Sequence, residues 1–421
     1  FVDPFFLLAL EDCPAHQQQR SVLYAQNKFK GTVLPALARP SKLPGKLRIG
    51  YFSADFHAHP VMRLIVKMLE LHDRSAFEIH GFSFGPDTSS DMRKRLAKSF
   101  NAFHDVREMA DKNIAKLAHS KGIDIAIDLT GYTQNSRSAI FSYRPAPVQV
   151  NYLGYPGTMG ADFIDYIIAD HTLIPKKNRR FYSEKIVYMP QCYQVSDNSR
   201  PVPEADVSRA ELGLPETGFV FCCFNTSLKI TPREFDIWMR LLTRVEGSVL
   251  WLRRSNKWSE INLKKEVKAR GVDPGRLVFA QECAYSKYLA RMTKADLFLD
   301  TFNYNAGAIA NDALWCGLPV LTLQGQSYVA RMASSLLTAI DLPELITVTE
   351  DDYARLALDL AGNPEKLESI KARLNTTREN SLLFDTAQFT KDIETAYRRM
   401  YDRYFAGENP AHLFVDEQEP H

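Results

Sequence analysis

From residue 47 onward, short runs of β-branched and aromatic residues alternate with stretches of helical periodicity. After the first run, apolar residues recur at the i, i+3, i+4 and i+7 spacing of one helix face, as Val61, Leu64, Ile65 and Met68. In this half we predict strands at 47–54, 77–84 and 123–129, and helices near 89–100 and 109–121. Strands that alternate with helices in this way form parallel sheets covered on both faces. The pattern therefore predicts an α/β fold.

A second alternation follows a connection that lacks periodicity, at residues 196–208, where two prolines and several small polar residues indicate an interdomain segment. The strands predicted beyond it are 219–225, 248–253, 276–280, 296–300 and 319–323. The helix predicted from about residue 232 has a packing face formed by Phe235, Trp238, Met239 and Leu242. Because 421 residues exceed what one core usually supports, we predict two Rossmann-like domains that face a central cleft, the GT-B architecture.

Composition argues against several classes of protein. The formal net charge is +2 and no block of five like charges occurs, so a nucleic-acid partner is not expected. No apolar run approaches the roughly 20 residues of a membrane span and no secretory signal opens the chain, which together favour a cytoplasmic location. The six cysteines lack the C-x-x-C spacing of a zinc site, so we interpret them as reduced thiols.

The turn after the first predicted strand, residues 53–60, contains Asp55, His57 and His59 and leads into a helix at Pro60. A carboxylate and two imidazoles at a strand end suggest acid–base work or contacts to a leaving group. The alternative is that Asp55 caps the helix and the histidines are exposed turn residues. A metal site is less favoured, because no further His or carboxylate has a matching motif.

In the second half, the turn 225–232 precedes a helix for which Thr231 is a good N-cap and Pro232 a good first residue. Lys229 therefore lies just before a helix N-terminus, where a cation and unpaired N–H groups suit a diphosphate. The alternative is a solvated loop lysine.

Three further turns are candidates for ligand contact. Residues 301–312 form a polar turn that contains Gly307, and Asp312 in the helix after it has the chemistry to hold ribose hydroxyls. Residues 144–147 (RPAP) and 152–158 (YLGYPGT) look rigid and ligand-lining, although Pro and Gly in turns require no function.

Segments 131–170, 183–190, 222–232, 248–254 and 312–323 closely resemble glycosyltransferase family 41, which includes O-GlcNAc transferases and SPINDLY-like proteins. The resemblance extends from about residue 5 to 406. It implies an inverting, metal-independent transfer of a sugar, by default GlcNAc from UDP-GlcNAc, to Ser or Thr of a protein acceptor, with no further cofactor. It also implies that any tetratricopeptide repeats lie upstream of Phe1.

The resemblance assigns roles to individual residues. His59 is similar to the family histidine beside donor and acceptor, Asp55 to the acid proposed as base or proton relay, and Lys229 to the lysine that binds the diphosphate. The implied donor-binding residues are Asn225, Thr226, Lys229, Tyr288, Arg291, Gly307, Ala308, Ile309 and Asp312. The implied acceptor or cleft residues are Pro60, Tyr132, Leu153, Gly154 and Pro156.

On the same basis we expect four parts. They are a helical lead-in at 1–46, interpreted as the end of an upstream repeat region; an N-terminal domain at 47–205; a nucleotide-sugar-binding domain at 206–385; and, at 386–421, a helix that packs on the first domain, followed by a tail.

Two departures from the family pattern keep other functions open. Gly307-Ala308-Ile309 stands where O-GlcNAc transferases have His-Thr-Thr at the diphosphate, and Tyr288 stands where they have a histidine against the uracil. The alternatives are another donor, such as GDP-fucose or a CMP-activated acidic sugar used on flagellin, a glycan or small-molecule acceptor, and a catalytically inactive nucleotide-binding module.

Overall fold

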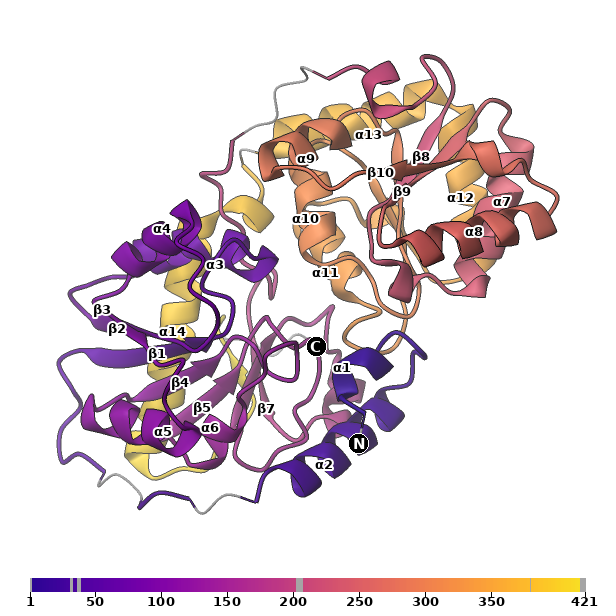
Figure 1. Cartoon of the computed structure of the whole chain (residues 1–421). Helices are drawn as coiled ribbons and strands as arrows, with labels where there is room; N and C mark the ends of the chain where they lie inside the picture. The colour runs from indigo at the N-terminus through magenta and orange to yellow at the C-terminus, as the bar shows by residue number, and fades with distance from the viewer. Residues whose placement is uncertain (1, 31–32, 36–38, 202–206, 379, 417–421) are drawn as a thin grey trace. The chain divides into compact units, whose positions relative to one another are not determined.

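The structure is a computed structural model, and it describes residues 2–30, 33–35, 39–201, 207–378 and 380–416. The chain divides into two compact units (Figure 1). The first consists of Phe1–Leu8, Cys13–Ser199 and Leu382–His421, and the second of Ala9–Asp12 and Arg200–Ser381. The domain boundary predicted between residues 205 and 206 lies outside the described residues.

The first unit contains an eight-stranded, fully parallel sheet in the order β14-β7-β6-β5-β4-β1-β2-β3. Its strands are β1 (Leu47–Ser53), β2 (Phe77–Ser83), β3 (Ala102–Asp105), β4 (Ile125–Asp128), β5 (Val148–Asn151), β6 (Tyr166–Ala169), β7 (Lys185–Tyr188) and β14 (Leu413–Phe414). The strand order reverses between β1 and β4, which pair in the register Ile49 to Ile125. In parallel α/β sheets, such a switch point is where ligands bind, at the carboxyl ends of the strands.

The helices of the first unit are α1 (Pro4–Leu7), α2 (Pro14–Lys28), α3 (Pro60–Leu71), α4 (Asp91–Ser99), α5 (Asp111–Ser120), α6 (Ala139–Ser142) and α14 (Thr386–Ala406). The predicted face of α3 is mostly inside, since Leu64, Ile65 and Met68 are at most 3% exposed. Helix α14, yellow in Figure 1, packs against α3, and a buried contact of 2.9 Å joins its Glu394 to Nδ1 of His72.

The second unit has a six-stranded parallel sheet in the order β10-β9-β8-β11-β12-β13. Its strands are β8 (Val220–Cys223), β9 (Val249–Arg253), β10 (Leu277–Ala280), β11 (Leu297–Leu299), β12 (Val320–Leu323) and β13 (Ile346–Thr347). Numbered along the unit, the order is the 3-2-1-4-5-6 arrangement of Rossmann folds. Its switch point lies between β8 and β11.

The helices of the second unit are α7 (Pro232–Arg244), α8 (Lys257–Ala269), α9 (Tyr285–Met292), α10 (Ala308–Trp315), α11 (Met332–Ala339), α12 (Glu350–Gly362) and α13 (Pro364–Thr377). The predicted face of α7 is buried, with Phe235, Trp238 and Leu242 each at most 3% exposed. In the described part of the chain, no helix is long and apolar enough to cross a bilayer.

Candidate active site

The first candidate group lies at the switch point of the first sheet. Ser53 ends β1, and its hydroxyl lies 3.3 Å from the Thr130 hydroxyl in the turn after β4. The backbone N–H of Ala54 donates to the same Thr130 oxygen at 3.0 Å, and that of Asp55 donates to Ser53 Oγ at 2.9 Å. These bonds fix the start of the turn that contains Asp55 and His59.

Asp55 and His59 lie close together in this turn, with 3.7 Å between Asp55 Oδ2 and His59 Nδ1. Burial, together with the nearby carboxylate of Asp128, raises the pKa of Asp55 to about 6. Burial lowers the pKa of His59 to about 4, with added repulsion from His57 and Arg63. At neutral pH the pair is therefore an ionised carboxylate beside a neutral imidazole, which suits proton transfer.

The alternative interpretation of Asp55 as the helix cap is wrong. His59 is the N-cap of α3, and its Nδ1 accepts a hydrogen bond from the N–H of Val61 at 3.4 Å. Pro60 is the first residue of the helix, as predicted, and it is exposed. Asp55 does not cap the helix, and its side chain is buried in the turn, with 8% of its surface exposed.

Arg93 of α4 forms hydrogen bonds that hold the turn after β1, and the sequence pattern did not predict them. Its buried guanidinium donates to the carbonyl of Phe56 at 3.2 Å and to Ser83 Oγ at 3.0 Å. An ion pair of 3.0 Å between Arg93 Nε and Asp87 orients the guanidinium. One arginine thus joins the turn after β1 to the end of β2 and to Asp87 beyond it.

The predicted acceptor turn follows β5 at the same sheet edge. Leu153 has a φ of +70°, and the N–H of Gly154 donates to the Tyr152 carbonyl at 2.9 Å, as in a γ-turn. A Cβ on Gly154 would lie 1.9 Å from the Leu129 carbonyl oxygen, so only glycine fits there. A strained residue at a strand end is a feature of binding sites.

Two of the predicted cleft residues, Tyr132 and Pro156, are buried within the first unit. Tyr132 is 0% exposed, its hydroxyl donates to the Met159 carbonyl at 2.7 Å, and its ring stacks on Phe29. Pro156 is also buried. Tyr132 was predicted as an acceptor or cleft residue, and its contacts in this structure are to residues inside the unit.

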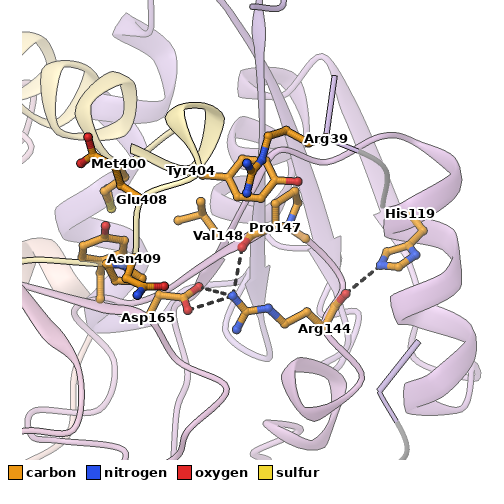
Figure 2. Close-up of a pocket in the computed structure, with 14 residues that line it drawn as sticks. Arg39, His119, Arg144, Pro147, Val148, Asp165, Met400, Tyr404, Glu408 and Asn409 are labelled. Carbon is orange, nitrogen blue, oxygen red and sulfur yellow. Dashed lines mark hydrogen bonds and ion pairs between the residues drawn. The ribbon is translucent and has the colours of Figure 1, made fainter. Parts of the chain in front are cut away.

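The segment 144–147 lies at the opposite end of β5 from Leu153. Arg144, Ala146 and Pro147 of this segment line a cavity of about 270 Å³, and Figure 2 shows how its lining residues lie. There the Arg144 guanidinium forms an ion pair of 2.7 Å with Asp165 and donates to the Pro147 carbonyl at 3.0 Å, while His119 contacts the Arg144 carbonyl. The rigidity predicted for this segment comes from these contacts, and they belong to the amino end of the sheet.

The second candidate group lies at the switch point of the second sheet. Asn225 follows β8, and its Nδ2 donates to Asp300 Oδ1 at 3.1 Å and to Thr301 Oγ1 at 2.8 Å. Asp300 follows β11 and is 0% exposed. It also accepts from the N–H groups of Thr301 and Ala306 and from the Thr322 hydroxyl. These bonds hold the turn that leads to α10.

Lys229 reaches this turn from the short helical segment before α7. Its Nζ donates to the Asn305 carbonyl at 3.0 Å and lies 3.5 Å from the centre of the Tyr304 ring, a cation–π contact. Burial lowers the pKa of Lys229 to about 8, although Asp300 opposes that shift. The alternative of a solvated loop lysine is therefore wrong.

Gly307, Ala308 and Ile309 form the start of α10, with Gly307 at the N-cap. Their side chains provide no hydroxyl or imidazole, so the hydrogen-bond donors at this helix start are backbone N–H groups. One turn later, Asp312 is 8% exposed and accepts from Arg200 at 2.7 Å and from the Tyr285 hydroxyl at 2.7 Å. Neither Arg200 nor Tyr285 was predicted as a site residue.

Helix α9 places Arg291 and Tyr288 together, with the guanidinium carbon 5.1 Å from the Tyr288 ring centre and 5.2 Å from that of Phe224. A cavity of about 640 Å³ lies beside this helix. Its lining includes Trp251, Phe279, Cys283 and Arg291. Two buried donors of residues that line it, Arg291 Nε and Trp251 Nε1, have no hydrogen-bond partner among the described residues.

Comparison with known proteins decides the family. The sequence model of glycosyl transferase family 41 matches this chain in two segments, residues 36–207 and 201–393. The chain belongs to glycosyl transferase family 41. Its fold is that of GT-B glycosyltransferases, with two Rossmann-like parallel sheets.

Within family 41 and among its curated relatives, the chain is similar to SEC of Arabidopsis thaliana, a probable UDP-N-acetylglucosamine–peptide N-acetylglucosaminyltransferase. The two are 35% identical over 431 residues, which covers 99% of this chain and 43% of the plant protein. Identity to the enzyme of that name from Caenorhabditis elegans is 28% over 489 residues, covering 89% of this chain and 42% of the worm protein. The chain thus spans about two fifths of the length of these curated relatives.

Among solved structures, a mutant of the Thermobaculum terrenum O-GlcNAc transferase superposes with a TM-score of 0.86 and 29% identity, over 94% of this chain and 75% of that chain. Sucrose-phosphate synthase from Thermosynechococcus elongatus has a TM-score of 0.60 and 14% identity, over 85% of this chain and 100% of that chain, a likeness of fold alone.

Proposed function

We propose that this family 41 chain transfers a sugar from a nucleotide sugar to a serine or threonine hydroxyl of a protein acceptor, with inversion and without a metal ion. UDP-GlcNAc is the default donor, because the relatives named above are N-acetylglucosaminyltransferases that act on peptide. The acceptor oxygen attacks the anomeric carbon, the bond to the diphosphate breaks, and the nucleoside diphosphate leaves.

The observation that carries this proposal is the position of Lys229. A half-buried ammonium group lies at the switch point of a Rossmann-type sheet, 3.0 Å from the Asn305 carbonyl and just before the capped start of α7. Negative charge grows on the diphosphate as the glycosidic bond breaks. A fixed cation in a poorly solvated site stabilises that charge without reorganisation.

In the first unit, the proposed roles belong to Asp55 and His59. Asp55 is ionised above a pH of about 6 and can take the proton of the acceptor hydroxyl. His59 is neutral above a pH of about 4, and its Nδ1 is occupied by the Val61 N–H, so Nε2 is the nitrogen available to a substrate. Leu153 and Gly154 are proposed acceptor contacts.

In the second unit, the proposed donor contacts are those predicted at Asn225, Thr226, Tyr288, Arg291 and Asp312, with the backbone of 307–309 at the phosphates. Thr226 is half-buried in the turn after β8. The cavity beside α9, with its two unpartnered donors, suits a polar base.

A second candidate is the same reaction with another donor, such as GDP-fucose or a CMP-activated acidic sugar. The start of α10 favours keeping this candidate, because Gly307, Ala308 and Ile309 offer the phosphates no side-chain donor. An inactive nucleotide-binding module is the third candidate, on the same observation.

A thermal-shift panel of UDP, GDP and CMP, each with its sugar conjugates, separates these functions, because a ligand that binds only the folded state raises the unfolding temperature. We expect UDP and UDP-GlcNAc to raise it most. A larger shift with GDP-fucose or a CMP-sugar replaces the default donor, and no shift with any nucleotide contradicts the proposed function.

A further inference from the structure

The carboxylate of Asp312 is held by two residues outside its own helix. Arg200 donates from Nη1 to Asp312 Oδ1 at 2.7 Å, and Tyr285 of α9 donates its hydroxyl to the same oxygen at 2.7 Å. Both members of the ion pair are buried, with Arg200 7% and Asp312 8% exposed. Two donors on one carboxylate oxygen fix the orientation of the group.

Arg200 is itself fixed by three contacts to α10. Besides Asp312, its Nη2 donates to Asn311 Oδ1 at 2.9 Å. Its guanidinium carbon lies 4.8 Å from the centre of the Trp315 ring. A planar, always charged guanidinium that bonds two neighbouring side chains and stacks on a third is much less free to rotate than a lysine would be.

The same tryptophan contacts a second arginine, which serves as a matched comparison. Arg378 lies 5.7 Å from the Trp315 ring and donates to the Trp315 carbonyl at 3.2 Å. No contact between Arg378 and Asp312 is among those described. Arg200 and Arg378 therefore share the packing on α10 and differ in their relation to the carboxylate.

We infer that Arg200 is a positioning residue that, with Tyr285, aims the Asp312 carboxylate at the ribose of the nucleotide and so sets the preference for ribose over deoxyribose. The inference rests on the proposed function, in which Asp312 is a donor contact, and assigns that contact to the ribose hydroxyls. Arg200 places a positive charge beside the buried carboxylate and, with Tyr285, holds its Oδ1. A carboxylate without this partner would lose both its charge compensation and its fixed direction.

The test is calorimetric binding of UDP, 2′-deoxy-UDP and 3′-deoxy-UDP to the wild type and to Arg200→Met, Arg200→Lys and Arg378→Met. We expect the wild type to prefer UDP over one of the deoxy forms by about tenfold or more, the usual effect of one hydrogen bond to a charged group. Arg200→Met should reduce that ratio to about threefold or less, and Arg200→Lys should restore part of it. Arg378→Met should keep the wild-type ratio.

Four outcomes overturn the inference. Equal loss of affinity for UDP and the deoxy forms in Arg200→Met means that Arg200 only supports the fold, which a lowered unfolding temperature of the free variant would also show. Tighter UDP binding by Arg200→Met means that Arg200 competes with the ribose. A lost ratio in Arg378→Met as well means that the packing on Trp315 is responsible. A wild type that binds UDP without any preference means that Asp312 does not meet the ribose.

The proposed function fails differently. A wild type that binds none of UDP, GDP and CMP contradicts nucleotide binding itself, and with it the inference. If GDP or CMP binds in place of UDP, the same comparison with its own 2′- and 3′-deoxy forms decides the role of Arg200, because the ribose chemistry is shared.

Discussion

Asn225 Nδ2 donates a hydrogen bond to Asp300 Oδ1 across 3.1 Å, and this bond joins the carboxyl ends of β8 and β11. It lies where the strand order of the second sheet reverses. Burial raises the pKa of Asp300 to about 6, and burial lowers the pKa of Lys229 to about 8. A carboxylate fixed by backbone and side-chain donors thus accompanies the ammonium group proposed to bind the diphosphate.

The first prediction concerns the pH dependence of kcat/KM. Asp55 must be ionised to take a proton, so activity should rise as the pH passes about 6. Lys229 must be protonated to stabilise the leaving group, so activity should fall as the pH passes about 8. His59 stays neutral above a pH of about 4 and should add no limb in this range. The residual activity of Asp55→Asn should no longer rise as the pH passes about 6. If the rise is unchanged in this variant, a group other than Asp55 causes it.

Asp55→Asn should also make the protein more stable at high pH. The folded-state pKa of about 6 lies above the ordinary 3.8, so the folded protein favours the protonated acid and wild-type stability falls as the pH rises through about 6. At pH 8 we expect a gain of about 1–3 kcal/mol in the free energy of unfolding for the variant, which fades toward pH 4. Urea unfolding at both pH values measures it. A variant that is less stable than the wild type at pH 8 would show that the carboxylate is structural.

His59→Ala should reduce turnover by roughly 10²-fold, because Nε2 of the imidazole is the proposed contact to the substrate. The lost N-cap should cost about 1 kcal/mol of stability. His57→Ala is the matched control, because His57 lies in the same turn and does not cap α3. Steady-state rates with saturating donor, compared at equal folded fraction, check this. If both variants turn over as fast as the wild type, His59 only caps α3 and has no role in the reaction.

The start of α10 predicts weak binding of UDP-GlcNAc. Replacing Gly307, Ala308 and Ile309 together by His, Thr and Thr supplies two hydroxyls and an imidazole to the phosphates, and each hydrogen bond to a charged group contributes roughly 1.5–3 kcal/mol. We expect the triple variant to bind UDP-GlcNAc about tenfold more tightly by calorimetry. If the wild type already binds at low micromolar affinity and the variant gains nothing, the departures have no effect on the donor.

The strands and helices with clear periodicity could be predicted, as β8 to β12 and the buried face of α7 show. The strands β5, β6 and β7 were not predicted, because no α-helix separates them among the described residues, so the alternation of strands with helices is missing there. Asp300 was placed inside the predicted strand 296–300. The structure ends β11 at Leu299, so its carboxylate belongs to the turn and to the site.

The site residues near one another in sequence could also be predicted, since the turns at 53–60 and 225–232 each lead from a strand into a helix. Arg200 and Tyr285 gave no such signal, because their contact with Asp312 is made only after residues more than 25 positions apart fold together. The surroundings of Tyr132 and Lys229 were likewise beyond the sequence, since burial depends on the tertiary packing around each turn.

The most direct test of the central claim is incorporation of labelled sugar from UDP-GlcNAc, GDP-fucose and CMP-sugars into protein, for the wild type and Lys229→Met. Lys264→Met is the control, because Lys264 also lies on an aromatic ring, 5.9 Å from the centre of Phe279, but on the exposed surface of α8. We predict transfer from one donor by the wild type and the control, and a loss of about 10²–10³ in rate for Lys229→Met with its fold intact. A Lys229→Met variant that retains more than about a third of wild-type activity, or a wild type that transfers no sugar from any of these donors, would contradict the account.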